Sequence, residues 1–306
     1  MNEDIENISF TIKQEAYKLG FYLCGICKAE EFAFEKKYMN DWLKKDSHGL
    51  MHYLEKNFEK RTNPSLLLEN AKSIIVVALN YNTINKQPED SPKFSKYVYG
   101  NDYHTVIKSK LYNLCETIKK NNPDSENKIC VDTVPILEKT AAQRAGLGWI
   151  GKHTCLINKK LGSFFFLGEI VTTLELKYDK PINDYCGTCN KCIESCPTGA
   201  IKSQYQLDAR KCISYNTIEN RGEIPESVFT NLNGWAFGCD ICQNVCPWNK
   251  KTIENTEPEF DIKSEMLNFN REQWNLISEI EFKRIFKTSA VNRIKFNQWK
   301  RNIESL

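Results

Sequence analysis

The sequence predicts an α+β fold, close in character to an α/β fold. A sheet-containing domain is followed by a cysteine-rich segment and a short helical part. Helical and strand patterns alternate over residues 1–181, as expected for helices packed on one sheet. Eight of the thirteen cysteines are confined to 182–249, and residues 250–306 have a helical pattern without repeats. These three ranges are the expected domains.

The N-terminal range begins with a predicted helix over residues 4–19, which Gly20 ends. Its apolar side chains recur at helical spacing, at Ile5, Ile8, Ile12 and Ala16. The next stretch, FYLCGIC at 21–27, alternates as a short strand does. Free cysteine packs as a small apolar residue, so we interpret Cys24 and Cys27 as buried strand residues. SIIVVALNY, at 73–81, is a continuous β-rich run that indicates a central strand.

Two helices and two strands complete this range. Residues 105–119 predict a helix and residues 128–132 a strand. Another helix is expected from near Pro135, because proline suits a first helical turn, to Ala145, where Gly146 and Gly148 follow. GSFFFLGEIVTTLEL, at 162–176, is a further strand region.

The cysteines of 182–249 have a spacing that is typical of iron–sulfur proteins. The first run is C-x2-C-x2-C-x3-C before Pro197, and the second, C-x2-C-x3-C before Pro247, lacks its first cysteine. In ferredoxins with two [4Fe–4S] clusters, the last cysteine of each run ligates the other cluster. Cys212 is the nearby candidate for the missing ligand. The expected ligands are Cys186, Cys189, Cys192 and Cys246 for one cluster, and Cys196, Cys212, Cys239 and Cys242 for the other.

Two other uses of cysteine fit this pattern less well. Structural zinc closes with four ligands and has no need of the longer run. Disulfide frameworks are typical of short secreted chains, whereas this chain has 306 residues and a polar, acidic start. No stretch approaches the apolar length that spans a bilayer, so no membrane is expected. We expect a reducing cytosol, where thiols and exposed clusters persist.

The net charge of +3 says little about partners, but basic residues gather near the C-terminus. Such a segment, with aromatic residues between the charges, can contact the phosphates and bases of a nucleic acid. The alternative, which the sequence slightly favours, is an amphipathic helix whose aromatic side chains dock on the body. The residues concerned are Lys283, Arg284, Lys287, Arg293, Lys295, Lys300 and Arg301, with Phe282, Phe286, Phe296 and Trp299.

The N-terminal domain must bind something that uses electrons, because domains of this kind hold ligands in their pockets. Neither a G-x-G-x-x-G fingerprint nor a P-loop occurs, so a nicotinamide or nucleoside triphosphate site has no support. A D-x-H-x-x-G run, in which a histidine displaces the lower ligand of cobalamin, is also missing. Pattern alone therefore leaves the electron acceptor unidentified.

Seven stretches, spread over nearly the whole chain, form a specific combination. They are EKRTNPSLLLENAKSIIVVALNY (59–81), YGNDYH (99–104), VDTVPILEKTAAQRAGLGWIGKHT (131–154), GSFFFLGEI (162–170), CGTCNKCIESCPTGAI (186–201), CISYNTIE (212–219) and FGCDICQNVCPWN (237–249). Read together, they resemble the epoxyqueuosine reductases, cobalamin-dependent enzymes of queuosine biosynthesis. The ferredoxin runs alone are widespread, whereas their combination with AGLGWIGKHT and CISYNTIE is much more specific.

The resemblance implies a nitroreductase-like cobalamin-binding core fused to the two-cluster module, with Cys212 as the displaced ligand. It implies that epoxyqueuosine at position 34 of a tRNA is reduced to queuosine, with two electrons and two protons and the release of water. The two [4Fe–4S] clusters would pass electrons singly to cobalamin. An external donor such as a flavodoxin or ferredoxin would supply them, and we expect a monomer.

The resemblance also implies roles for single residues. The proton donor is the aspartate of the V-D-T motif, Asp132; without the resemblance, a turn or helix-capping role would be favoured. Cys239 and Asp240 are expected to bring the second cluster against the corrin, and Arg221 corresponds to a basic position that meets the tRNA. The expected cobalamin contacts are Arg61, Ser95, Asp132, His153, Leu156, Leu167, Ser214, Cys239 and Asp240.

One departure and two rival functions remain at this point. Members of this family commonly continue into a helical-repeat domain that helps hold the tRNA, and this sequence ends at Leu306 without it. A reductive dehalogenase would share the core and cofactor, but such enzymes typically follow a twin-arginine signal, and the first ten residues contain no arginine. A non-catalytic iron–sulfur electron carrier would need neither cobalamin nor a proton donor.

Overall fold

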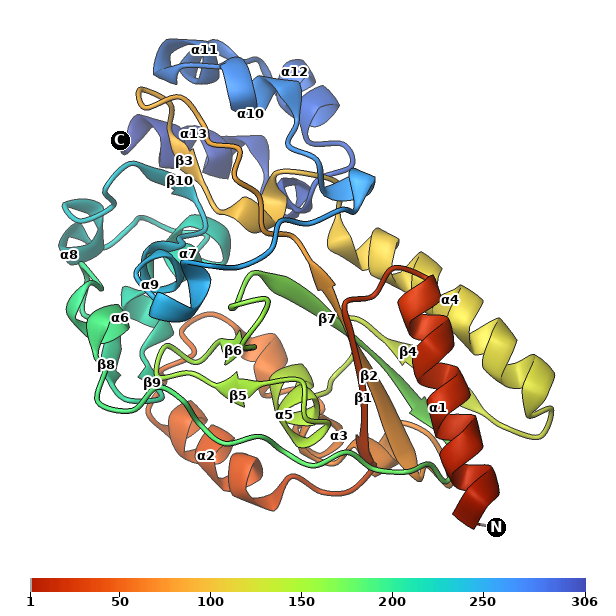
Figure 1. Cartoon of the computed structure of the whole chain (residues 1–306). Helices are drawn as coiled ribbons and strands as arrows, with labels where there is room; N and C mark the ends of the chain where they lie inside the picture. The colour runs from red at the N-terminus through yellow and green to blue at the C-terminus, as the bar shows by residue number, and fades with distance from the viewer. Residues whose placement is uncertain (1) are drawn as a thin grey trace.

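The centre of the N-terminal part is a four-stranded antiparallel sheet with the strand order β1-β2-β7-β4 (Figure 1). The computed structural model describes residues 2–306. Strand β2 pairs with β7 over eight residues, from Ser73 opposite Thr172 to Asn80 opposite Phe165, and all eight β2 residues are buried. The strands are β1 (Leu23–Lys28), β2 (Ser73–Asn80), β4 (Asn127–Cys130) and β7 (Phe165–Thr172).

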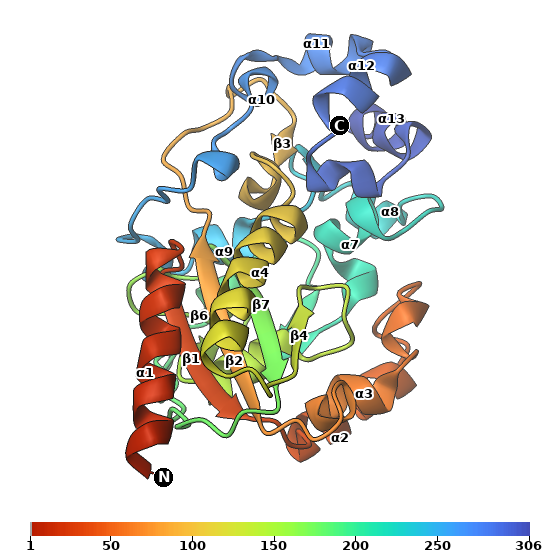
Figure 2. The same cartoon turned by 90° about the vertical axis from the view of Figure 1, so that its right-hand side faces the viewer.

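Each face of this sheet is covered by helices. Helices α1 (Asn2–Lys18) and α4 (Tyr103–Asn121) lie side by side on one face, where Ile12, Ile107 and Leu111 pack against the sheet (Figure 2). Helix α5 (Glu138–Arg144) covers the other face through Ala141 and Ala142. Cys24 and Cys27 are buried in β1, as their interpretation as packing residues requires.

The start of α5 is the clearest difference from the predicted elements. The helix begins at Glu138 instead of near Pro135. The preceding main chain forms tight turns, in which Thr133 N–H donates to the Val131 carbonyl and Ile136 N–H to that of Val134. Asp132 has a φ of +49°, a left-handed value that a continuing helix excludes. The proline therefore belongs to a turn, and the turn places Asp132.

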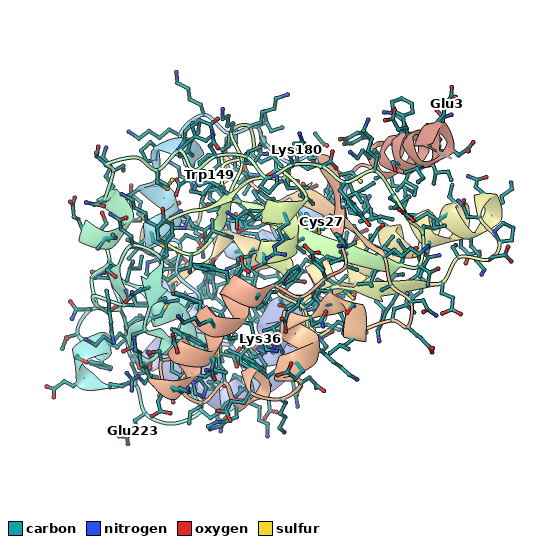
Figure 3. All side chains as sticks on the ribbon, turned by 90° about the horizontal axis from the view of Figure 1, so that it is seen from below. Glu3, Cys27, Lys36, Trp149, Lys180 and Glu223 are labelled. Carbon is teal, nitrogen blue, oxygen red and sulfur yellow. The ribbon has the colours of Figure 1, made fainter. Side chains whose placement is uncertain are left out.

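The segment between β1 and β2 wraps around the lower edge of the sheet. It holds α2 (Ala33–Lys44), the 3-10 helix η1 (His52–Leu54) and α3 (Phe58–Thr62). Two short strands, β5 (Trp149–Ile150) and β6 (Leu156–Ile157), follow α5 as a hairpin. Figure 3, drawn from below, places Glu3 of α1 and Glu223 of the cysteine-rich segment at opposite ends of the molecule.

The cysteine-rich segment is built of short elements that join the N-terminal part through a parallel pair, β3 (Lys93–Phe94) with β10 (Trp235–Phe237). Helices α6 and α9, one in each cysteine run, pack against each other. The remaining elements are α6 (Lys191–Glu194), β8 (Ile201–Ser203), β9 (Gln206–Leu207), α7 (Ile213–Ile218), α8 (Glu226–Phe229) and α9 (Ile241–Asn244).

The C-terminal part is helical, as predicted, and its aromatic side chains are core residues. Phe282, Phe286 and Trp299 are buried against Phe94 and Trp274, so they are not free to stack on nucleic-acid bases. This confirms the docked alternative for the aromatic residues. The helices are α10 (Ser264–Asn268), α11 (Arg271–Leu276), α12 (Glu279–Ile285) and α13 (Phe296–Glu304), and the 3-10 helix η7 (Ala290–Arg293) lies before α13.

Arg301 of this part has a structural role that its sequence position does not show. Its guanidinium donates to the backbone carbonyls of Asn216, Asn220 and Gly222, at the end of α7 and just after it. Asn302 next to it donates to the carbonyls of Thr217 and Ala236. Arg301 therefore ties α13 to the cysteine-rich segment. Within residues 2–306, no helix is both long and apolar enough to cross a membrane.

The burial of Trp299 leads to a stability prediction. Trp299 is fully buried and contacts four aromatic rings, so Trp299→Ala should cost about 3–5 kcal/mol through lost contacts and the cavity left behind. Differential scanning fluorimetry should show a melting temperature several degrees lower. Lys295→Ala, at the exposed start of α13, is the matched control and should melt like the parent. Equal melting of the two variants would contradict the packing of α13.

Candidate functional site

A cavity of about 1080 Å³ lies between α4, β4, α7 and η7. It exceeds the range of roughly 300–1000 Å³ that is usual for small-molecule pockets, and so suits a large ligand. Asp132 and Ser214, both expected at the site, line it together. Tyr103, His104 and Arg293 also line it, and Arg293 is paired with Glu219 at 2.7 Å.

Asp132 is held in this cavity by the first turn of α4. Its Oδ2 accepts a hydrogen bond from the Tyr103 hydroxyl at 2.9 Å and lies 3.0 Å from His104 Nε2. The other ring nitrogen of His104, Nδ1, lies 2.7 Å from Asp102 Oδ1. Asp102 also caps α4 by accepting from the His104 N–H. One imidazole thus bridges two carboxyl groups.

This bridge favours the imidazolium form of His104. Both ring nitrogens face carboxylate oxygens, and only the doubly protonated ring can donate to both. Burial alone would lower the pKa of His104, but the hydrogen bonds with Asp102 and Asp132 outweigh it and raise the pKa to about 9. At neutral pH, His104 therefore carries a proton directly beside Asp132.

The same contacts also act on the pKa of Asp132. A proton donor must carry its proton when it acts. Burial does raise the pKa of Asp132, but hydrogen bonds from His104 and Tyr103 outweigh it and leave the pKa below its usual value. Asp132 is consequently an anion in this state of the molecule, and the exchangeable proton of the pair resides on His104.

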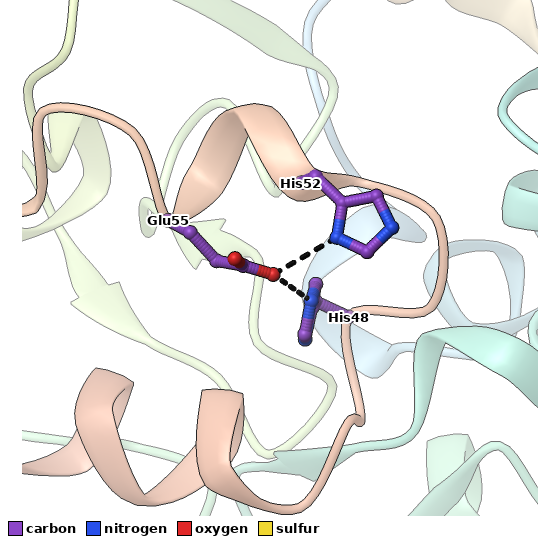
Figure 4. A group of neighbouring side chains, drawn as sticks. All are labelled: His48, His52 and Glu55. Carbon is purple, nitrogen blue, oxygen red and sulfur yellow. Dashed lines mark hydrogen bonds and ion pairs between the residues drawn. The ribbon is translucent and has the colours of Figure 1, made fainter.

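The segment between α2 and α3 forms one wall of the cavity, where Tyr53 lies in η1. Glu55 fixes this segment: its Oε1 lies 2.7 Å from His48 Nε2 and 3.0 Å from His52 Nδ1 (Figure 4). These hydrogen bonds account for the close approach of the two rings. Tyr215 of α7 supports the segment by accepting the Leu50 N–H.

Arg61 lies behind the Asp132 turn. Its carbonyl accepts from Leu137 N–H, just before α5. Burial lowers the pKa of the Arg61 guanidinium, and the nearby carboxyl groups of Asp132 and Glu138 oppose this. Arg61 Nε is buried and has no hydrogen-bond partner among the residues that the structure describes. A buried donor without a partner is unfavourable, but Arg61 does not line the large cavity.

The other expected cobalamin contacts do not meet in the same cavity. Ser95 donates to Asp240 Oδ1, and Lys96 N–H donates to Asp240 Oδ2 at 2.8 Å. Asp240 and Lys96 line a second cavity, of about 780 Å³. Leu156 and Leu167 belong to the apolar cluster under α5.

His153 lies at the cysteine runs. It lines a small cavity, of about 260 Å³, whose cysteines are Cys186, Cys189, Cys192 and Cys246. These are the four residues expected to share one cluster. Lys152, which is 3% exposed, fixes the first run by donating to the carbonyls of Gly187 and Cys189 at 2.7 and 2.9 Å.

The remaining four cysteines are also neighbours. Burial raises the pKa of the Cys239 thiol, and the nearby thiols of Cys212 and Cys196 raise it further. The Cys242 thiol likewise lies close to those of Cys212 and Cys239. Cys212 comes immediately before α7, whose next residues include Ser214 at the large cavity.

Sequence reasoning missed Tyr103 and His104, although both belong to the YGNDYH stretch. An aspartate that precedes an aromatic residue and a histidine at a helix start was the available signal. This signal was too weak alone, because Asp132, the second partner of His104, is 28 residues away in a turn.

Comparisons with known proteins agree with this geometry. Residues 185–249 match the family model of the 4Fe-4S double cluster binding domain, and residues 61–133 match that of epoxyqueuosine reductase QueG. An epoxyqueuosine reductase of Cellulophaga algicola is 45% identical over 301 residues, covering 98% of both chains. The chain belongs to the epoxyqueuosine reductase family. As a member, it is an oxidoreductase with two [4Fe–4S] clusters.

Solved structures of epoxyqueuosine reductases have the same fold. One, in complex with an epoxyqueuosine-modified stem loop of tRNA-Tyr, matches with a TM-score of 0.91 and 32% identity. The Bacillus subtilis enzyme, solved with its aspartate catalytic loop swung out of the active site, matches with a TM-score of 0.89 and 30% identity. Both alignments cover 98% of this chain and 80% of the other. A catabolic reductive dehalogenase, at 17% identity and a TM-score of 0.50, shares the fold alone.

The arrangement of the cysteines leads to a prediction about iron. Anaerobically reconstituted protein should hold about eight iron atoms per chain, because two cubanes hold four each. Cys212→Ala should lower this to about four, since Cys212 is the predicted fourth ligand of the second cluster. Iron analysis and the visible absorption spectrum measure both. Cys115→Ala, on α4 away from the cysteine runs, should keep all the iron. Full iron in Cys212→Ala would refute the ligand assignment.

Proposed function

We propose that this protein reduces epoxyqueuosine at position 34 of a tRNA to queuosine. The observation that carries the proposal is the large cavity beside the cysteine-rich segment. The carboxylate of Asp132 and the protonated ring of His104 both face this cavity. The relationship over 98% of an epoxyqueuosine reductase supports it. The reaction consumes two electrons and two protons, replaces the epoxide by an alkene and releases water.

The chain's residues fit the groups that this chemistry needs. The eight cysteines would hold two [4Fe–4S] clusters, and cobalamin in the large cavity would pass their electrons to the epoxide. Asp132 and Ser214 line this cavity and would contact the cobalamin. The family resemblance adds Arg61, Leu156 and Leu167 as contacts, which lie behind the Asp132 turn and in the apolar cluster under α5. Ser95, Asp240 and Cys239 would hold the segment between the second cluster and this cofactor. His153, which lies at the cysteine runs, would contact the cofactor where it faces the clusters.

Asp132 would deliver the proton to the opening epoxide oxygen, since alkoxide is a poor product at neutral pH. Because Asp132 is anionic in this structure, we infer that it takes the proton from the His104 imidazolium, 3.0 Å away. Asp102 holds His104 in the orientation for this transfer. Tyr103, stacked on Phe166 with parallel rings 4.3 Å apart, fixes the position of the Asp132 carboxylate.

The tRNA would lie across the open side of the cavity. Arg221 is exposed beyond α7 and is held there by Gln298, and Lys108 of α4 lines the cavity with an exposed ammonium group. Arg301, by contrast, is committed to backbone carbonyls. We assign tRNA contacts to Arg221 and Lys108, and a structural role to Arg301.

The proposal also covers the domain boundaries, the electron donor, the oligomeric state and the cellular compartment. We propose the cobalamin-binding part at 1–181, the two-cluster part at 182–249 and the helical part at 250–306. An external flavodoxin or ferredoxin would donate electrons to the monomeric enzyme in the reducing cytosol.

The proton-transfer proposal predicts a catalytic defect. Asp132→Asn keeps the shape of the side chain but removes the acid, so turnover of epoxyqueuosine tRNA should fall about 10²–10⁴-fold. Iron content and corrin absorbance should stay at the parental level. Asp124→Asn, at an exposed turn, is the control and should keep full activity. Parental turnover in Asp132→Asn, or a loss explained by lost cobalamin, would make Asp132 a binding residue.

A pH profile tests the source of the proton. The pKa of His104 is raised to about 9, so the proton is present below that pH and is lost above it. We expect kcat to be constant through neutral pH and to fall as the pH rises through about 9. In His104→Gln, the glutamine amide still donates a hydrogen bond to Asp132 but has no titratable proton. The kcat of this variant should be lower than that of the parent and should no longer fall as the pH rises through about 9. An unchanged profile in the variant would exclude His104.

Salt dependence tests the tRNA contacts. Each phosphate contact contributes a slope of about −0.7 to −0.9 to the log–log dependence of affinity on salt. Arg221→Gln combined with Lys108→Gln should therefore flatten the slope by roughly 1.4–1.8, measured by fluorescence anisotropy with labelled tRNA. Lys120→Gln, at the far end of the same helix as Lys108, should leave the slope unchanged. An equal slope in the double variant would place the tRNA elsewhere.

A further inference from the structure

Two glutamates that the proposed mechanism does not use lie directly behind the Asp132 turn. Glu138 is the first residue of α5 and is half-buried, and Glu169 lies in the middle of β7. Glu169 is opposite Val76 of β2 and Cys130 of β4, so it is enclosed by strands on both sides.

Glu169 has no exposed surface, and an ionised side chain does not suit its surroundings. Alternation along β7 places it on the same face as Phe165 and Val171, within the apolar cluster under α5. An ionised Glu169 would have no hydrogen-bond donor for either carboxyl oxygen within residues 2–306. A buried carboxylate without a partner is strongly unfavourable, so Glu169 requires either a proton or a donor.

The neighbouring carboxyl group is that of Glu138. Burial raises the pKa of Glu169 well above its usual value, and the Glu138 and Asp132 charges and a hydrogen bond with Glu138 raise it further. Burial, followed by the Asp132 charge, also raises the pKa of Glu138, to about 7. Two carboxylates have no donor between them, whereas one proton creates an O–H···O bond. The more deeply buried Glu169 is the natural carrier of that proton.

Glu138 connects this pair to the main chain of the cavity turn. Its Oε1 accepts the N–H of Asp132 at 2.5 Å. Asp132 has a φ of +49°, which is disfavoured for a residue with a side chain and persists only where contacts hold it. Tyr103 and His104 hold its carboxylate from the cavity side, and Glu138 holds its amide from the sheet side.

We propose that Glu138 and Glu169 form a proton-sharing carboxyl pair that fixes the main chain of Asp132 and so positions its carboxylate in the cavity. Glu169 donates its proton to Glu138, and Glu138 remains an acceptor for the Asp132 amide. Both are positioning residues, since neither faces the cavity. Their catalytic consequence rests on the proposed role of Asp132, but their effect on the turn does not.

A simpler interpretation is that Glu138 merely complements the positive end of the α5 dipole. That interpretation explains an acidic residue in the first helical turn. It does not explain why the carboxylate bonds an amide outside the helix, or why a second carboxyl group is buried beneath it. It also predicts no dependence of the Asp132 amide on Glu169, which makes the two interpretations separable.

Hydrogen–deuterium exchange of the holoenzyme, followed by mass spectrometry on the peptide containing Asp132, tests the pair. In Glu169→Gln, the amide NH₂ replaces the shared proton as donor to Glu138, so exchange at Asp132 should match the parent. In Glu169→Leu, Glu138 loses this donor, and exchange should be at least about tenfold faster, as expected for loss of a hydrogen bond to a charged group. In that variant kcat should fall about 10–100-fold with an unchanged KM for tRNA.

Glu138→Ala is the second variant, because an alanine at a half-exposed helix start does not threaten folding. It removes the acceptor of the Asp132 amide and should speed exchange as Glu169→Leu does. Parental exchange in both Glu169→Leu and Glu138→Ala would overturn the positioning role. Equally fast exchange in Glu169→Gln and Glu169→Leu, with iron and corrin retained, would overturn the shared proton. If Asp132→Asn kept parental turnover, the donor assignment would fail, while the exchange data would still decide the pair.

Discussion

The antiparallel pairing of β2 with β7 is the interaction on which the rest of the structure depends. These two strands fill the middle of the sheet and are covered on both sides, so they fix the positions of α4 on one face and α5 on the other. Gly168 in β7 permits the close approach of α4, since a Cβ there would come within 2.6 Å of Ile107. Strand β4 is aligned by β7 and ends at Cys130, two residues before Asp132. The end of this sheet therefore determines where the cavity lies.

Several charged side chains at this end of the sheet form hydrogen bonds with main-chain groups and so have a structural role. Lys152 donates to carbonyls of the first cysteine run, Arg301 to carbonyls around the end of α7, and Asp240 accepts the amide of Lys96. The cysteine-rich segment has short helices and small apolar clusters of its own. It cannot be ordered by a large core, so long cationic side chains and backbone-directed carboxylates take over that task.

Contacts between ionisable groups also decide which side chains around Asp132 carry a proton. Four carboxyl groups and one imidazole are close enough to influence one another, so none has its ordinary pKa. His104 keeps a proton because two carboxylates face it, and Glu138 and Glu169 keep one because two buried anions repel. Asp132, between these two protonated sites, is left ionised. The proton-donor role that we propose for Asp132 thus depends on the whole cluster.

The sequence by itself determined the chemistry of the cysteines and the identity of the main elements. Cysteine spacing is local information: it specifies which thiols can reach one cubane, and it pointed to Cys212 as the missing ligand. The β-branched run of β2 and the periodicity of α1 and α4 likewise depend on near neighbours in the chain. The motif combination then identified the family, and Asp132 with it.

Only the tertiary structure decided how Asp132 is held and which state it has. The start of α5 moved from Pro135 to Glu138 because the turn before it is fixed by Glu138. The pKa of Asp132 is depressed although burial alone would raise it, because His104 approaches from helix α4. The sequence left Arg301 either as a nucleic-acid contact or as part of a docked helix, and only its carbonyl partners, about 80 residues earlier in the chain, give it a structural role. Each of these outcomes depends on contacts between distant segments, whose distances and desolvation no local pattern encodes.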